Sequence, residues 1–211
     1  MPWEKPPLIR PQPPKPPLVA PIPPTLALPA NAPTRAIQML IVDPYYPRDH
    51  ALRMQAMAAA IASQAGVRLQ FPPIAEFLMP AWITFTEEQL PSVRNYAKQH
   101  TNHVVLLVKT IFISRPDDTR YVGGLGGARF SIIAAVSCEP SIIHEFLHPA
   151  LAAARIDPPD GHRNVPGNVM HKTTCGTNYT NIDADQAAAL RVWASKKAGA
   201  REVEYERVWW C

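Results

Sequence analysis

The stretch "SIIHEFLHPALAAARIDPPDGH", residues 141–162, decides how the rest of this sequence is interpreted. It contains two histidines, His144 and His148, four positions apart, with Glu145 between them. Residues four apart share one face of an α-helix, so both imidazoles can direct a ring nitrogen at a single metal ion. A glutamate beside that face can take a proton from a metal-bound water. The segment therefore predicts a helix that supplies two metal ligands and a general base.

The sequence on both sides of this helix predicts alternating strands and helices. We expect strands within 35–43, 67–73, 103–113 and 131–137, and helices within 50–66, 86–100 and 181–199. Asp49 is the expected cap of the first helix, and the second is expected to start near Leu90. Asp183 and Gln186 have capping-box spacing, and Gly199 is expected to close the last helix. The expected fold is mixed α/β (α+β), with two or three helices covering a sheet.

Proline marks the beginning of the chain as a separate region. Of the 25 prolines in the 211 residues, 13 fall within the first 33 positions. Proline removes backbone donors and fixes φ, so residues 1–34 are expected to be disordered or in polyproline II conformation, as a spacer or a docking site for a partner. Residues 35–211 are expected to form the folded domain. We expect an upper lobe over 35–150 and a lower lobe over 151–211.

Charge and hydropathy limit the expected partners. The net charge is +4, and the basic residues are scattered, which predicts no nucleic-acid partner. No apolar run reaches the length of a membrane span, and the beginning of the chain does not resemble a secretory signal. We expect a monomer. Localisation stays open between the cytoplasm and a non-classical export route, and the latter would suit a bacterial effector.

Cysteine and the remaining histidines give weaker signals. Cys138 and Cys175 flank the metal-binding segment, so a disulfide between them is one expectation and two free thiols are the other. The remaining histidines fall at the ends of expected elements or, in one case, near a later turn. We expect His50, His100 and His103 to lie on the surface.

A second motif lies downstream of the histidine pair. "GNVMH" places Met170 in a short turn 22 residues after His148, and the capped helix follows it. In these two motifs and in the order of its elements, the chain resembles the metzincins, zinc peptidases with an HExxHxxGxxH motif and a Met-turn beneath the metal. The resemblance implies a twisted sheet, an active-site helix and a small C-terminal lobe that ends in a helix. It also implies one catalytic Zn²⁺.

The third ligand departs from the metzincin pattern. Leu151 and Ala154 stand where the family has its glycine and third histidine. Pro149 is expected to kink or break the helix and so redirect the chain. His162, after the "DPPDG" turn, is then the expected third ligand. The alternatives are Asp157, Asp160 and His171, of which the last is expected rather to line the pocket.

The resemblance implies a zinc endopeptidase acting on an extended polypeptide. Glu145 would be the catalytic base, and Tyr179 is a candidate for assisting the oxyanion. "YVGGLGGARF", residues 121–130, takes the place of the family's edge strand, where glycines would let a peptide backbone approach. A flexible hairpin loop is the alternative for that segment. For the whole chain, the alternative is a non-catalytic binding or structural module with a proline-rich docking tail.

Overall fold

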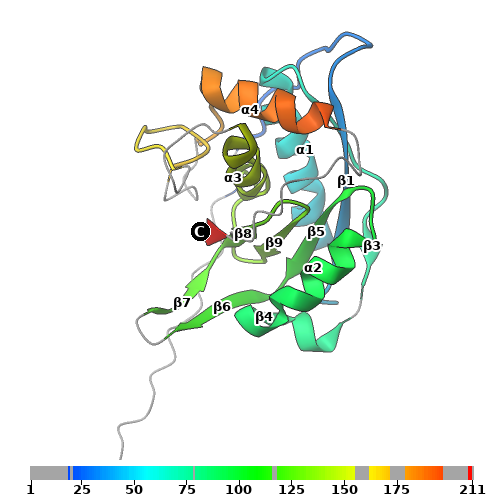
Figure 1. Ribbon diagram of the computed structural model, residues 1–211, viewed down its shortest axis with the longest axis vertical. Coiled ribbons are helices and arrows are strands. Elements are labelled where there is room, and N and C mark those ends of the chain that lie inside the picture. The colour runs from blue at the N-terminus through cyan, green and yellow to red at the C-terminus, as the bar shows by residue number, and fades with distance from the viewer. Residues whose placement is uncertain are drawn as a thin grey trace, which may run out of the picture.

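The structure is a computed structural model that describes residues 19, 21–77, 79–115, 118–154, 162–171, 179–196 and 209–210. Within these ranges the fold is mixed α/β, as expected, with four α-helices and two mixed sheets (Figure 1). The helices are α1 (Arg48–Gln64), α2 (Leu90–Lys98), α3 (Ser141–Ala154) and α4 (Ala184–Ser195). The strands are β1 (Thr34–Ile41), β2 (Arg68–Gln70), β3 (Ala75–Glu76), β4 (Thr84–Thr86), β5 (His103–Val108), β6 (Thr110–Arg115), β7 (Asp118–Val122), β8 (Gly124–Gly126), β9 (Phe130–Ala134) and β10 (Trp209–Trp210).

The larger sheet has the strand order β10-β8-β9-β5-β1-β2, and β3 also pairs with β1. The central pairs β5–β9, β1–β5 and β1–β2 are parallel. β8 runs antiparallel to β9 on one side and to β10 on the other. Parallel strands are normally covered on both faces, and every residue of β5 is buried. The strand expected to begin at His103 is therefore present and is buried on both faces.

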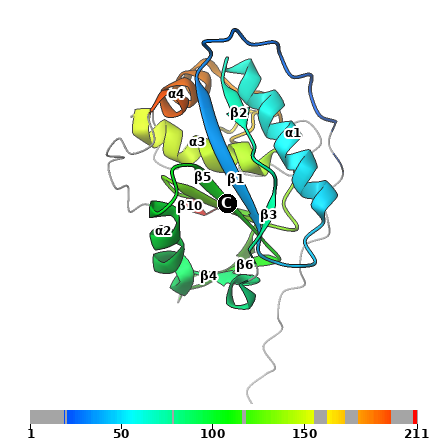
Figure 2. The same cartoon turned by 90° about the vertical axis from the view of Figure 1, so that its right-hand side faces the viewer.

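Alternate side chains of β5 enter two separate apolar layers. Val105 and Leu107 join the cluster formed with α1, α3 and α4. Val104 and Leu106 join a second cluster, with α2 and the smaller sheet. This alternation follows from the two-residue period of a strand, and Figure 2 shows the helices on both sides of the sheet. Helix α3 therefore lies in the layer with α1 and α4.

The expected strand over 103–113 is wrong in one respect, because it is two strands. β5 ends at Val108 and β6 begins at Thr110, in the smaller sheet of order β4-β6-β7. Between them, the backbone N–H of Lys109 donates to the carbonyl of Ile83, 3.0 Å away. A mostly apolar run, here interrupted by Lys109 and Thr110, indicates burial, but it does not tell which sheet buries it.

Two helix starts test the expected boundaries. α2 begins at Leu90, as predicted. α1 begins at Arg48 and is capped by Pro47, so Asp49 lies in the first turn and is not the cap. Proline is tolerated at this position because its missing N–H is not required there and its φ of −65° is compatible with the helix, while its ψ of 111° is extended. Asp49 still favours the helix through the macrodipole.

α4 has the capping box that its sequence predicts. The N–H of Gln186 donates to the Asp183 carboxylate at 2.8 Å, and the Asp183 N–H donates to the Gln186 side chain at 2.9 Å. The helix ends at Ser195, four residues before the expected end at Gly199. Gly199 itself lies outside the described residues.

Part of the proline-rich region packs on the domain. The Leu26 N–H donates to the Ser63 hydroxyl of α1 at 2.9 Å, and the Arg68 guanidinium donates to the carbonyls of Leu28 and Pro29. Residues 1–18 lie outside the described part of the chain. The expected boundary at residue 34 and the division into lobes stay predictions.

Among the described residues, no helix has the length and apolar character that crossing a membrane requires.

Candidate metal centre

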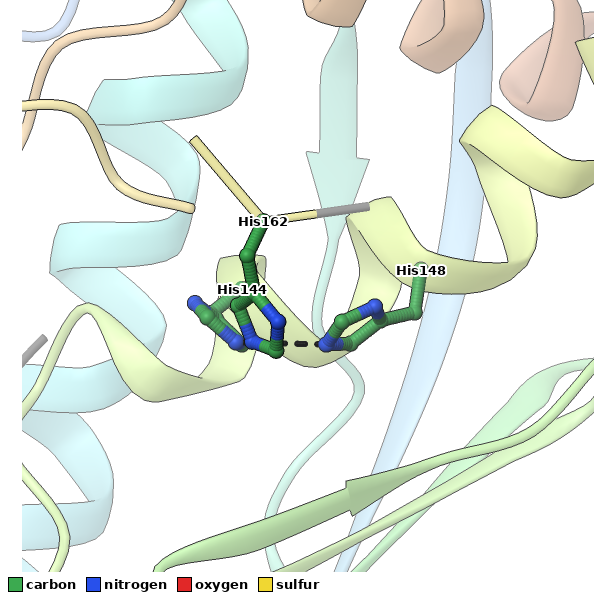
Figure 3. A group of neighbouring side chains, drawn as sticks. All are labelled: His144, His148 and His162. Carbon is green, nitrogen blue, oxygen red and sulfur yellow. Dashed lines mark hydrogen bonds between the residues drawn. The ribbon is translucent and has the colours of Figure 1, made fainter. Parts of the chain in front are cut away.

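Three histidines come together at the centre of the candidate site. His144 and His148 lie one turn apart on α3, and His162 approaches them from the segment that follows (Figure 3). One ring nitrogen from each lies within 4.8 Å of the other two. Both α3 histidines are 1% exposed. This group could hold a metal ion, and it contains His162 and not His171.

A backbone carbonyl fixes the orientation of the first imidazole. Nδ1 of His144 lies 2.7 Å from the carbonyl oxygen of Val169. Because a carbonyl only accepts, Nδ1 carries the proton and Nε2 is the nitrogen left to bind a metal. Nε2 of His144 lies 3.2 Å from Nε2 of His148. Two ligand nitrogens on a tetrahedral zinc ion would be about 3.3 Å apart, given Zn–N bonds of about 2.0 Å.

Burial keeps His144 in the form that binds metals. Removal from water lowers its pKa to about 4, and the neighbouring His162 contributes in the same direction. The hydrogen bond to the Val169 carbonyl acts against this shift, but it is the smaller effect. The imidazole is therefore neutral near pH 7, which is the state that ligation requires.

The third histidine is tied to the later turn through the residue that follows it. The backbone N–H of Arg163 donates to the carbonyl of Met170 at 2.9 Å. The Arg163 side chain forms an ion pair with Asp183, the cap of α4, at 3.2 Å. These two contacts hold the chain next to His162 against the turn and against the start of α4.

The turn itself is held by a buried pair of amides. The side chains of Asn168 and Gln186 exchange two hydrogen bonds, of 3.0 and 2.9 Å, and Gln186 is fully buried. The Asn168 side chain also accepts from the N–H of Met170 at 2.8 Å. The N–H of Val169 donates to the carbonyl of Asn181. The same turn therefore aims the Val169 carbonyl at His144 and anchors Arg163.

Asn168 is a site residue that the sequence analysis missed. The motif "NVM" drew attention to the methionine, which is fully buried in the cluster shared with α3. The sequence signal that could have pointed to Asn168 is Gln186, the capping-box glutamine of α4. A buried amide needs a partner that offers both a donor and an acceptor, and another amide is such a partner. Only the fold shows that Asn168 is that partner.

Glu145 lies against the glycine strand. It is 1% exposed, and its side chain faces Gly124 of β8. A Cβ atom at Gly124 would stand 2.8 Å from Cδ of Glu145, and one at Gly126 would stand 2.6 Å from its backbone oxygen. Real Cβ atoms essentially never approach that closely. The glycines at 124 and 126 therefore make room for the glutamate and for the backbone of α3.

Segment 121–130 was expected to be either an edge strand approached by a peptide or a flexible hairpin loop, and it matches neither expectation fully. Residues 124–126 form a strand of the main sheet, which excludes the flexible loop for them. The backbone that approaches the glycines belongs to α3. The outer edge of the strand is paired with β10.

Pro149 does not end α3, so of the expected kink or break the break is wrong. α3 continues through it to Ala154. Proline at position 149 has no N–H to donate to the carbonyl of Glu145, four residues back. That carbonyl lies against Gly126 of β8, as described above. The close approach of β8 takes place at the point where the helix has lost one of its own donors.

Several other predicted residues lie beside the group or outside the described structure. The ring of His171 stacks on that of Tyr179, with centroids 5.1 Å apart. Asp157, Asp160 and Cys175 lie outside the described residues. Cys138 is buried, with its sulfur 3.4 Å from the Ser141 hydroxyl. The disulfide and the role of Tyr179 stay predictions.

The expectation of three surface histidines fails for His103, which is fully buried. Its Nε2 lies 3.0 Å from the Ser131 hydroxyl, and its ring meets Phe146 and Trp193 edge-on. Burial lowers its pKa well below the usual value, and the charge of Arg35 adds to the effect. Its place at the first position of a central strand accounts for the difference. His50 and His100 are partly exposed.

The arrangement can hold one metal ion through three imidazoles, beside a buried carboxylate on the same helix. The turn that contains Met170 binds both His144 and the neighbour of His162. In comparisons with known proteins, no family model, no curated protein and no solved structure matches this chain.

Proposed function

We propose that this chain is a zinc-dependent endopeptidase of the metzincin type. The observation that carries the proposal is the meeting of His162 with the two helix histidines. The fixed spacing of HEFLH brings two of the nitrogens together in any helix. The third arrives from a different segment, in which the neighbouring Arg163 contacts Met170 and Asp183.

Zinc suits this donor set. Three neutral imidazoles and no fourth protein ligand are typical of catalytic zinc, whereas structural zinc is closed by four protein ligands. Among the described residues, the group contains three histidines and no cysteine or carboxylate. When bound, zinc acts as a Lewis acid on the scissile carbonyl and makes water acidic enough to be deprotonated near neutral pH. The hydrogen bond from Nδ1 of His144 to the Val169 carbonyl leaves Nε2 as the nitrogen that would bind the ion.

In this proposal Glu145 is the general base and later the general acid. It would take a proton from the attacking water and return it to the leaving amine. Packing between α3 and β8 supports this role because it restricts where the carboxylate can lie. The substrate is an extended polypeptide, and β8 is the strand nearest to the carboxylate for it to follow.

The test combines metal content with hydrolysis. Wild type, His162→Ala, Glu145→Gln and the control His171→Ala are purified without added metal, and their metals are identified by mass spectrometry. We expect about one zinc per chain in wild type, in Glu145→Gln and in the control, and a loss in His162→Ala. Hydrolysis of an unfolded polypeptide should fall roughly 10²- to 10⁴-fold in Glu145→Gln.

The contradicting outcomes separate the alternatives. Zinc that is retained without any hydrolysis of polypeptide would favour a binding module or a hydrolase with another substrate. Full zinc in His162→Ala would remove the third ligand from the proposal. Absence of zinc from wild type after zinc has been supplied would refute the peptidase itself.

A further inference from the structure

The outer edge of β8 is occupied by the chain's own last described segment. Trp209 and Trp210 form β10, which pairs antiparallel with β8 (Figure 1). Trp209 lies opposite Gly126, and Trp210 lies opposite Leu125. On the inner side, the same β8 residues pair with β9. Among the described residues, β10 is thus the last strand on this side of the sheet.

This edge lies next to the residue that we propose as the base. Gly124 and Gly126 are two positions apart, so they share the face of β8 that packs on Glu145. Leu125 points the other way, into the cluster with α2. A strand on the outer edge of β8 therefore lies about 4.8 Å from a strand that contacts Glu145 directly.

The pairing of β10 is of the kind that any extended peptide can make. It consists of main-chain hydrogen bonds in an antiparallel ladder, which depend little on side-chain identity. A strand has two edges, and β9 already takes one of them. A peptide and β10 therefore cannot pair with β8 at the same time.

We propose that Trp209–Trp210 occupies the edge on which the polypeptide substrate docks, so that this segment is an intramolecular competitor of substrate. The activity part of this inference rests on the proposed peptidase function, and the occupancy part does not. A segment within the same chain competes at an effective concentration on the order of millimolar. A free peptide must displace it to reach β8.

The first test measures occupancy on metal-free protein. A synthetic peptide with the sequence of residues 203–210, VEYERVWW, is titrated into wild type and into a chain that ends at Val208. We expect binding to the shortened chain and binding at least about tenfold weaker to wild type, since the tethered copy competes. Hydrogen exchange at the amide of Gly126, the residue opposite Trp209, should be faster in the shortened chain and slow again when the peptide is added. Equal binding to both chains, or unchanged exchange, would overturn the proposal.

A second variant leaves the chain length intact. The double substitution Trp209→Pro and Trp210→Pro removes both N–H groups, one of which must point toward β8 in an antiparallel pair. It should behave as the shortened chain does, whereas Cys211→Ser should behave as wild type. If Cys211→Ser alone reproduced the effect, the thiol and not the strand would be the occupant, and the proposal would fail.

Hydrolysis separates this inference from the proposed function. Removal of a competitor lowers KM for an unfolded polypeptide and leaves kcat unchanged, whereas loss of a merely structural strand lowers kcat and the melting temperature. Peptide competition without hydrolysis by either chain would refute the peptidase and uphold the occupied edge. Hydrolysis with the same KM in both chains would uphold the peptidase and refute the competitor.

Discussion

Replacing Gly124 of β8 by alanine should displace the proposed base while leaving the metal ligands in place. The new Cβ would stand 2.8 Å from Cδ of Glu145 and 3.0 Å from its Cγ. Ordinary van der Waals contact begins at 3.4 Å, so Cδ must move by at least 3.4 − 2.8 = 0.6 Å, and the carboxylate oxygen Oε1, which lies nearer still to the new Cβ, must move further. The atoms in the way belong to a side chain, which can move without its helix.

The magnitude follows from that displacement. A misplacement of about 1 Å in a catalytic group lowers the rate roughly 10²-fold, so a shift of the carboxylate by at least 0.6 Å should lower kcat/KM by at least about 10-fold. Stability should change less, by about 1 kcal/mol, because the lower chain entropy of alanine offsets part of the overpacking.

The neighbouring substitution Gly126→Ala should act mainly on stability. Its Cβ would stand 2.6 Å from the backbone oxygen of Glu145, so α3 and β8 must separate by 3.4 − 2.6 = 0.8 Å. Overpacking against backbone should destabilise the fold by about 1 to 2 kcal/mol, or roughly 2 to 4 °C in Tm for each kcal/mol.

Gly66→Ala is the matched control. Its backbone φ is +72°, and no atom lies within 4 Å of the added Cβ. It should lose about 1 kcal/mol through left-handed backbone strain and keep full activity. Thermal unfolding, zinc content and kcat/KM of the three variants are compared with wild type. Full kcat/KM in Gly124→Ala, or an equal loss in Gly66→Ala, would refute the reasoning.

Two further predictions concern buried polar groups. Because the pKa of His103 is lowered by folding, its imidazole binds a proton in the unfolded chain at pH values where it stays neutral in the folded chain. The contribution of His103 to the free energy of unfolding is therefore fully present above about pH 6.5. Below that pH it is lost at up to about 1.4 kcal/mol per pH unit. Denaturant titrations from pH 7.5 to 5 should show a shallower slope for His103→Gln but not for His100→Gln, and equal slopes in all three proteins would contradict the assignment. Asn168→Ala removes the partner of the buried Gln186 amide, so it should destabilise the fold by about 1 to 3 kcal/mol. It should also weaken zinc binding roughly 10- to 100-fold. Unfolding and metal competition measure the two effects, and Val165→Ala, at an exposed position, is the control. Unchanged zinc affinity in Asn168→Ala would show that the amide pair does not position the site.

Local patterns were sufficient for much of the fold. The five residues HEFLH place two imidazoles together through helix geometry alone. The Asp183 cap and the start of α2 at Leu90 likewise depend on neighbours within one turn. The placement of His162 followed from its position after a turn, and the structure brings it to the helix pair.

The predictions that were wrong concern features that depend on contacts between segments far apart in the sequence. No local pattern tells that the chain leaves one sheet at Val108 and enters another at Thr110. The burial of His103 comes from α3 and α4, which lie far along the chain. Helix propensity alone predicted a kink or a break at Pro149, whereas α3 packs against β8 and α4 and continues through the proline. The two tryptophans of β10 gave no strand signal, because a pair of residues has no measurable period.

The bond from Arg163 to Met170 has a consequence for how such centres are found. It places the third histidine by reference to the turn and not by its distance along the chain from the second. The number of residues between the two histidines can then vary among chains that share the same arrangement of imidazoles. A search that demands one fixed interval would pass over such chains, whereas a search for HExxH followed by an amide-braced turn would recover them.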